Sequence, residues 1–200
     1  MKSIKHSMLL FAVAAGIAFA PACTNNKTNE EGKTAEDPKE AAEEHNDAKF
    51  TTNSSEKDAQ FLVDAAEVNL AEVSLGKLAS TQGMTKEVRE LGEMMTREHQ
   101  KAYDDLSSLA KKKSITIPAA ASDDAQKKYN TLSEKRGSDF DKDFCDAMVS
   151  GHKDAIDKFE RASKESTDPD IQTWASNMLP SLRMHLDHSM TCQEKVSAMK

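Results

Sequence analysis

Residues 139–164 read DFDKDFCDAMVSGHKDAIDKFERASK, and the spacing of their apolar residues decides the fold class. The apolar positions at helical spacing are Phe140, Phe144, Met148, Ala155 and Phe159. This spacing places them along one face of an α-helix. His152 falls on the same face, within the apolar stripe. The segment therefore predicts a long amphipathic helix that directs one titratable side chain toward the core.

The segment that follows predicts a second long helix, from Asp168 and Pro169 to about Ala198. Asp168 can accept hydrogen bonds from the free backbone N–H groups at a helix start, and proline is favoured at the first helical position. Pro180 lies inside the segment and has no amide donor, so a kink is expected there. With Ser138 as the expected N-cap of the preceding helix, the two segments predict an antiparallel hairpin.

Two earlier segments, 56–81 and 86–112, carry apolar stripes of the same period. Ser55 and Thr85 are placed to cap these helices, and Gly83 is expected to end the first one in the left-handed conformation. Together with the later pair they give four long amphipathic segments. Such a set predicts an all-α fold, an antiparallel four-helix bundle.

The connection between the second and third long helices is longer than the other two. Residues 115–118, Ile-Thr-Ile-Pro, predict a break, and residues 123–135 predict a short extra helix within the connection. No alternating strand pattern of useful length occurs, and no internal repeat. Residues 56–200 are therefore expected to form one helical domain of about 145 residues, a common domain size.

The first residues predict export from a bacterial cell. Two lysines precede an uncharged apolar run from Met8 to Ala20, and small residues follow it. A positive start, a short apolar stretch and a small-residue cleavage site make a secretory signal, here residues 1–22. Cys23 stands where a bacterial lipoprotein carries its lipid, which predicts a membrane anchor. The alternative is ordinary cleavage before Cys23, which would leave a soluble periplasmic protein with a free thiol.

Residues 23–55 are expected to be a lipid-anchored, disordered tether, because they contain almost nothing apolar to bury. The anchor makes a membrane the partner that the sequence indicates, and it favours the periplasm-facing side of the outer membrane as the location. The net charge of −7 argues against nucleic-acid binding, which requires a basic face. A protein partner is not indicated.

Each long helix places one ionisable residue in or beside its apolar stripe. These residues are Glu72, His99, His152 and His185. Leaving such groups buried and unpaired would cost roughly several kcal/mol. A shared ion would remove that cost, and three neutral imidazoles with a carboxylate suit a single zinc, copper or iron ion. His152 and His185 are equidistant from the 168–169 turn and are expected at one height, whereas Glu72 fits the height of His99 less well and could lie behind the ligands.

Two other functions remain open at this point. The histidines could be hydrogen-bonded core residues of a non-catalytic structural or stress-related interaction lipoprotein. An enzyme is the third hypothesis, but the sequence has no glycine-rich phosphate loop, no Cys-x-x-Cys and no His-Glu-x-x-His motif. The residues three before the histidines are Thr96, Val149 and Leu182, so the Glu-x-x-His motif of di-iron bundles is absent.

Cys145 and Cys192 repeat the geometry of the histidine pair. Each lies seven residues from the histidine of its own helix, on the side away from the turn, so the two cysteines are expected at one height. In an oxidising compartment, two level cysteines on neighbouring helices predict a disulfide. The alternative is two separate buried thiols.

Several stretches of the sequence resemble one bacterial family. They are Phe61-Leu62-Val63, Ala71-Glu72-Val73, Leu75-Gly76-Lys77-Leu78-Ala79, Glu98-His99, Gly137 with Phe140-Asp141, and Leu179-Pro180 with His185-Leu186. Together they cover about residues 56–195 and resemble the ferritin-like family known as domain of unknown function 4142, often labelled an outer-membrane protein. The resemblance implies a ferritin-like four-helix bundle in the cell envelope and no established activity. The Asp-His pair that is usual in the family is Glu98-His99 in this chain.

Overall fold

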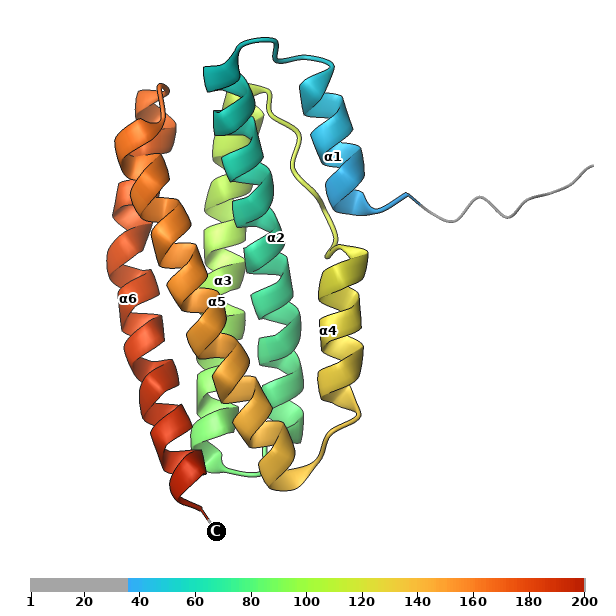
Figure 1. The fold of residues 1–200 in the computed structure, drawn as a ribbon, viewed down its shortest axis with the longest axis vertical. Helices are drawn as coiled ribbons and strands as arrows, with labels where there is room; N and C mark the ends of the chain where they lie inside the picture. Colours follow the sequence, from blue (N-terminus) through green and yellow to red (C-terminus); the bar gives the residue numbers. More distant parts are fainter. Residues whose placement is uncertain (1–35, 200) are drawn as a thin grey trace, which may run out of the picture. The chain divides into compact units, whose positions relative to one another are not determined.

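A computed structural model describes residues 36–199, which form six helices and no strand in that range (Figure 1). The helices are α1 (Pro38–Asp47), α2 (Asn53–Gln82), α3 (Lys86–Lys113), α4 (Asp123–Ser133), α5 (Gly137–Glu165) and α6 (Pro169–Ala198). The predicted all-α class is confirmed. The predicted signal peptide, residues 1–22, and the predicted anchor at Cys23 lie outside the described residues. None of the described helices combines the length and the apolar character that a membrane span needs.

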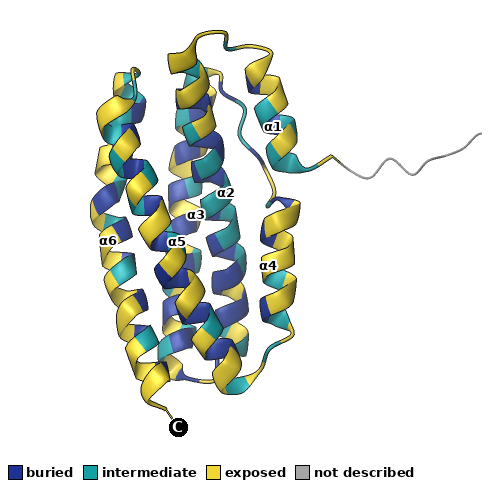
Figure 2. Cartoon of the chain, in the orientation of Figure 1, coloured by how far each residue is buried: buried dark blue, intermediate teal, exposed yellow. Residues whose placement is uncertain are grey.

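The long helices pack side by side as two hairpins (Figure 1). α2 packs along α3, and α5 packs along α6, while the hairpins meet through α2 with α5 and through α3 with α6. Buried residues follow the inward stripes of these helices (Figure 2). They form two apolar clusters, one around Leu62, Leu106 and Phe159 and the other around Phe140 and Phe144. His99 on α3, His152 on α5 and His185 on α6 each lie along the helix between the residues of one cluster and those of the other.

A buried carboxylate ties the α2–α3 turn to the start of α5. Asp141 is fully buried and accepts hydrogen bonds from the backbone N–H groups of Met84 and Thr85, each at 2.8 Å. It also accepts one from the Thr85 hydroxyl, at 2.7 Å. Thr85 in turn accepts from the Val88 N–H and caps α3, as predicted. The bonds to Asp141 fix where α3 begins relative to α5, which sets the heights of the residues farther along both helices.

The helix ends confirm some of the predicted caps and correct others. Asp168 caps α6 with Pro169 in its first turn, as predicted, and α6 continues through Pro180. The N-cap of α2 is Thr52, three residues before the predicted Ser55, because its hydroxyl accepts from the Ser55 N–H. Gly83 ends α2 with φ −55°, so the predicted left-handed conformation is wrong. α5 begins at Gly137 without a side-chain cap, so Ser138 does not have the predicted capping role.

The prediction of a disordered tether through residue 55 is wrong from Pro38 onward, because α1 forms there and packs on α2. Asp37 caps α1, and Ala42 and Asn46 are buried. The Asn46 amide donates to the Thr116 carbonyl at 2.8 Å and accepts from the Thr116 N–H at 2.9 Å. Asp37-Pro38 is the same helix-start signal as Asp168-Pro169, but the packing of this helix could not be read locally, since the partners of Asn46 lie 70 residues away in the α3–α4 connection.

Candidate metal centre

Three helices bring the three inward histidines together. His99 comes from α3, His152 from α5 and His185 from α6, and each side chain is at most 2% exposed. One ring nitrogen from each histidine can serve as a ligand atom, and these three nitrogens lie within 4.8 Å of one another. The ring centroids are 5.2 to 5.4 Å apart in all three pairs. The predicted convergence of the histidines, and the equal height of His152 and His185, are therefore confirmed.

The hydrogen-bond network fixes which nitrogen of His99 is free. The side-chain amide of Asn69 on α2 donates to the Ala65 carbonyl at 2.8 Å, so its oxygen points the other way. That oxygen accepts a hydrogen bond from His99 Nδ1 at 2.9 Å. Because Nδ1 carries the proton in a neutral imidazole that donates there, Nε2 carries the lone pair.

The same reasoning applies to His152. Its Nδ1 lies 2.9 Å from the Met148 carbonyl, which can only accept, so Nδ1 carries the proton and Nε2 the lone pair. The Nε2 atoms of His99 and His152 are 3.4 Å apart, so two lone pairs face each other. Both ring nitrogens of His185 are buried and have no hydrogen-bond partner in the described part of the chain. Three imidazoles thus present nitrogen atoms to one point that no internal donor satisfies.

Burial keeps these imidazoles neutral. It lowers the pKa of His99 well below the ordinary value, and the neighbouring His152 and His185 lower it further. Burial also lowers the pKa of His152, and it lowers the pKa of His185 to about 4, with His152 adding to the effect. A neutral imidazole is the form that binds a metal ion.

The arrangement suits a transition-metal ion. In His99 and His152 the other ring nitrogen, Nδ1, is held by an oxygen of the protein, which is the usual outer support of a metal-binding histidine, whereas His185 has no such support within the described range. No carboxylate or cysteine joins the three histidines in this group, in the range the structure describes. Three imidazoles leave a fourth position of a tetrahedral ion open to water or a small ligand.

Glu72 does not join the histidine group, so its predicted role as a direct ligand is not supported, and the alternative that it lies behind the ligands stays a prediction. It is buried on α2 and lines a cavity between α2 and α5, where its Oε1 lies 3.2 Å from the place a Cβ on Gly151 would occupy. Its Oε2 is buried without a hydrogen-bond partner, and burial raises its pKa to about 8. The buried face of α2 is wide. Asn69 on this face contacts α3, whereas Glu72 on the same face lies against α5, and both positions appear inward in the sequence pattern.

Sequence reasoning missed Asn69 as part of the site. Asn69 is buried in the apolar stripe of α2, three residues before Glu72, and it supplies the oxygen that holds His99. The signal was an amide among apolar residues at helical spacing, which must find a partner when buried. His188, one turn beyond His185, is exposed, as its position on the outer face of α6 indicates.

The two cysteines are adjacent, as their spacing predicts. Cys145 and Cys192 are buried free thiols whose Sγ atoms are 2.7 Å apart. The hydrogen bond between them raises the pKa of the Cys145 thiol, and burial raises it further. The equal height of the cysteines is confirmed, and the disulfide between them stays a prediction.

A family model described as Domain of unknown function (DUF4142) matches residues 40–191, most of the chain. The chain belongs to this family. Membership confirms the family that the sequence resembles and extends the match into α1, because residue 40 lies in that helix. Comparisons with curated proteins and with solved structures found no match. Since the family description states no activity, the function of this DUF4142 protein has to be argued from its side chains.

Proposed function

We propose that this DUF4142 protein binds one divalent transition-metal ion, such as zinc, copper or iron, through His99, His152 and His185. The observation that carries the proposal is the pair of lone pairs on His99 Nε2 and His152 Nε2, 3.4 Å apart in a buried site. A purely structural role would require hydrogen bonds at these nitrogens, and His185 has none within the described range. A bound cation would satisfy all three imidazoles at once.

Elemental analysis tests the proposal directly. The full-length chain, purified in detergent and loaded separately with Zn²⁺, Cu²⁺ or Fe²⁺ before desalting, should retain about one equivalent of at least one metal. The double variant His152→Ala/His185→Ala should retain none. His188→Ala is the matched control, since His188 is an exposed histidine on the same helix as His185, and it should bind like the parent. Metal retained by the double variant would refute the site.

We also infer a location, a lipid-anchored position on the periplasmic side of the outer membrane. Its support is the sequence of residues 1–22, which has the form of an export signal, followed by Cys23. Cys23→Ser should move the protein from the membrane fraction to the soluble periplasmic fraction. A variant that stays with the membrane would contradict lipid anchoring at this residue.

The arrangement of the long helices is proposed to be the four-helix bundle of ferritin-like proteins. Support comes from two hairpins of long helices whose connection contains the short helix α4. The proposed centre nevertheless differs from a di-iron site. Thr96, Val149 and Leu182 occupy the positions where such sites place glutamates, so a mononuclear centre is expected.

A further inference from the structure

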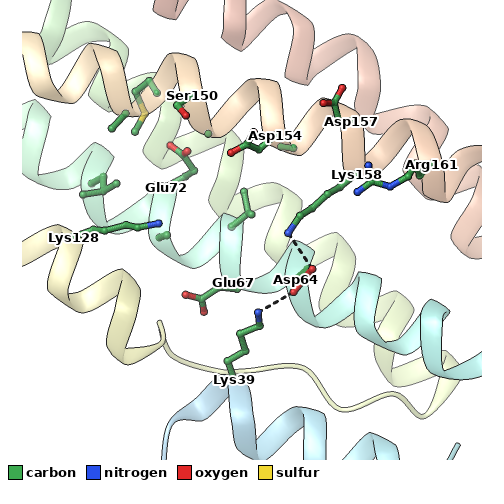
Figure 3. A pocket seen from close by; sticks show the side chains of 17 residues that line it. Lys39, Asp64, Glu67, Glu72, Lys128, Ser150, Asp154, Asp157, Lys158 and Arg161 are labelled. Atoms are coloured by element: carbon green, nitrogen blue, oxygen red, sulfur yellow. Dashed lines mark hydrogen bonds and ion pairs between the residues drawn. The ribbon is translucent and has the colours of Figure 1, made fainter.

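A second polar site lies between α2, α4 and α5, outside the group of three histidines (Figure 3). It is a cavity of about 650 Å³. Val68 and Leu75 of α2 and Met148 of α5 give it an apolar wall. Glu72 is its buried polar group, and Lys128 extends from α4 toward the Glu72 side of the cavity (Figure 3).

Glu72 is unpartnered in this cavity. Its side chain is 6% exposed, its Oε2 is buried, and no hydrogen bond or ion pair reaches it from the described residues. Gly151 leaves room for it, since a Cβ there would come within 3.2 Å of Oε1. A buried carboxyl group without a partner is costly, so its presence in the lining of a cavity indicates a missing ligand.

None of the cations that line the cavity pairs with Glu72, which leaves a place for a cationic ligand. Lys128 and Arg161 are exposed and make no ion pair with Glu72 among the described residues. Lys39 and Lys158 both form ion pairs with Asp64, each at 3.0 Å, and so do not balance Glu72. Asp154 lies on α5 beside Glu72 at the exposed side of the cavity, and it makes no ion pair within the described range (Figure 3).

We propose that this cavity binds a small aliphatic amine. The ammonium group would pair with Glu72, the alkyl chain would lie against Val68, Leu75 and Met148, and Asp154 would contact a second polar end of the ligand. An alkyl body suits the apolar wall, and an ammonium supplies the donors that a buried carboxylate requires. A metal ion fits less well, because no group of three His, Cys, Asp or Glu ligand atoms surrounds Glu72 in the described range.

Binding should displace a proton from Glu72. The other charged groups that line the cavity are Lys39 from α1, Asp64 and Glu67 from α2, Lys128 from α4, and Asp154, Asp157, Lys158 and Arg161 from α5; none of them is a histidine. Since burial raises the pKa of Glu72 to about 8, the empty cavity holds a neutral carboxyl group at neutral pH. Pairing with an ammonium requires the carboxylate, so affinity should rise about tenfold per pH unit from about pH 6 to about pH 8.

Titration calorimetry with n-butylamine tests the proposal on the full-length chain. We expect saturable binding, with a heat that depends on the ionisation enthalpy of the buffer because one proton is released. Glu72→Gln should weaken binding at least about tenfold, the loss of one charge-assisted contact, and its thermal melt should show that it remains folded. Glu90→Gln, an exposed glutamate on α3, is the matched control and should bind normally.

Two outcomes would overturn the amine site. One is equal affinity of the parent and Glu72→Gln chains, and the other is equal binding of n-butanol, which has a similar alkyl chain but no charge. The amine site and the proposed metal centre share no ligand residue, since Glu72 lies outside the group of three histidines. His152→Ala/His185→Ala should therefore keep its affinity for n-butylamine while losing metal, so the two proposals can fail separately.

Discussion

The chemistry of single residues explains why His99 is a better ligand than an isolated core histidine. Asn69 is oriented by its own bond to the Ala65 carbonyl, and it then fixes the proton of His99 on Nδ1. Without that bond the imidazole could rotate or change tautomer, and Nε2 would not be reserved for an ion. The Asn69 side chain therefore positions His99, and it is not itself a proposed ligand of the metal.

Asn69→Ala should weaken metal binding by about 10- to 100-fold, the usual effect of removing an outer partner of a ligand. The metal-free protein should also lose about 1 to 3 kcal/mol of unfolding free energy, because His99 Nδ1–H would be buried unsatisfied. Competition with a chromophoric chelator measures the first effect. Ser74→Ala is the control, since Ser74 on the same helix bonds only to the Leu70 carbonyl. Equal affinity of parent and Asn69→Ala would contradict the role of Asn69.

Glu72 gives the metal-free protein a distinct pH dependence. Its pKa is about 8 in the folded chain, above the ordinary carboxyl value, so the unfolded chain releases this proton first as pH rises. The free energy of unfolding is therefore not reduced by Glu72 below about pH 4.5, where the group is protonated in both states. It falls as pH rises from there through 8, because only the folded chain keeps the proton. The three histidines act in the opposite direction, since their lowered pKa values cost stability as pH falls below about 6.5.

Glu72→Gln should be more stable than the parent at about pH 8 by roughly 3 to 5 kcal/mol, and the difference should shrink toward about pH 5. The difference between the two chains isolates Glu72 because both contain the same histidines. Urea unfolding at several pH values measures it, and Glu90→Gln should follow the parent curve. A difference that does not vary with pH would show that Glu72 keeps an ordinary pKa in the folded chain.

The close approach of α2 and α3 depends on two glycines. A Cβ at Gly92 would lie 2.6 Å from the Gly76 carbonyl oxygen, and a Cβ at Gly76 would lie 2.7 Å from the Gly92 carbonyl oxygen. Both contacts are with backbone, which cannot move aside as a flexible side chain can. The two helices can therefore pack at this distance only where neither has a side chain.

Gly92→Ala should destabilise the fold by about 1 to 3 kcal/mol, even though alanine favours helix formation by about 1 kcal/mol relative to glycine. The steric cost outweighs the helix preference because the neighbouring atoms are backbone. Gly151→Ala is the comparison, since its Cβ would meet only the end of the Glu72 side chain, and it should cost less. Thermal or urea unfolding of the two variants measures the difference. An increase in stability for Gly92→Ala would show that α2 and α3 are farther apart.

The elements that could be predicted from sequence are those whose information is local. The period of apolar residues predicts the long helices, and Thr85 and Asp168 mark two of their starts correctly. The packing of α1 could not be predicted, although Asp37-Pro38 marks its start, because Asn46 gains its partners only after residues 114–118 are in place. Gly83 ends α2 as predicted, but its backbone conformation is not a local property, since the turn that follows it is bonded to Asp141 across the fold.

The candidate site was predictable to the extent that heights along a hairpin can be counted. His152 and His185 are equidistant from one turn, and the continuous α6 preserves that register. The height of a residue along its helix does not determine which neighbouring helix its side chain faces. That is why Glu72 was grouped with the histidines and Asn69 was overlooked, although the two lie on the same helix and both are buried.

The whole α5–α6 hairpin carries two level pairs of residues. The histidine pair lies between the two apolar clusters, and the cysteine pair belongs to one of them. Cys145 and Cys192 belong to the cluster near the hairpin's open end, where no turn holds the helices together. A covalent link there would prevent the open ends from separating. In the oxidising compartment proposed for this protein, the adjacent buried thiols should therefore form a disulfide.

The protein isolated from the periplasm should lack free thiols at Cys145 and Cys192, as alkylation under denaturing conditions followed by mass spectrometry would show. Reduction should lower the unfolding free energy by about 4 kcal/mol, because the disulfide closes a long loop in the unfolded chain. Cys192→Ser should be insensitive to reductant, which separates the disulfide from other effects of the reagent. Two alkylated cysteines and an unchanged urea midpoint would instead mean that this pair remains as thiols, and that packing alone holds the open end of the hairpin.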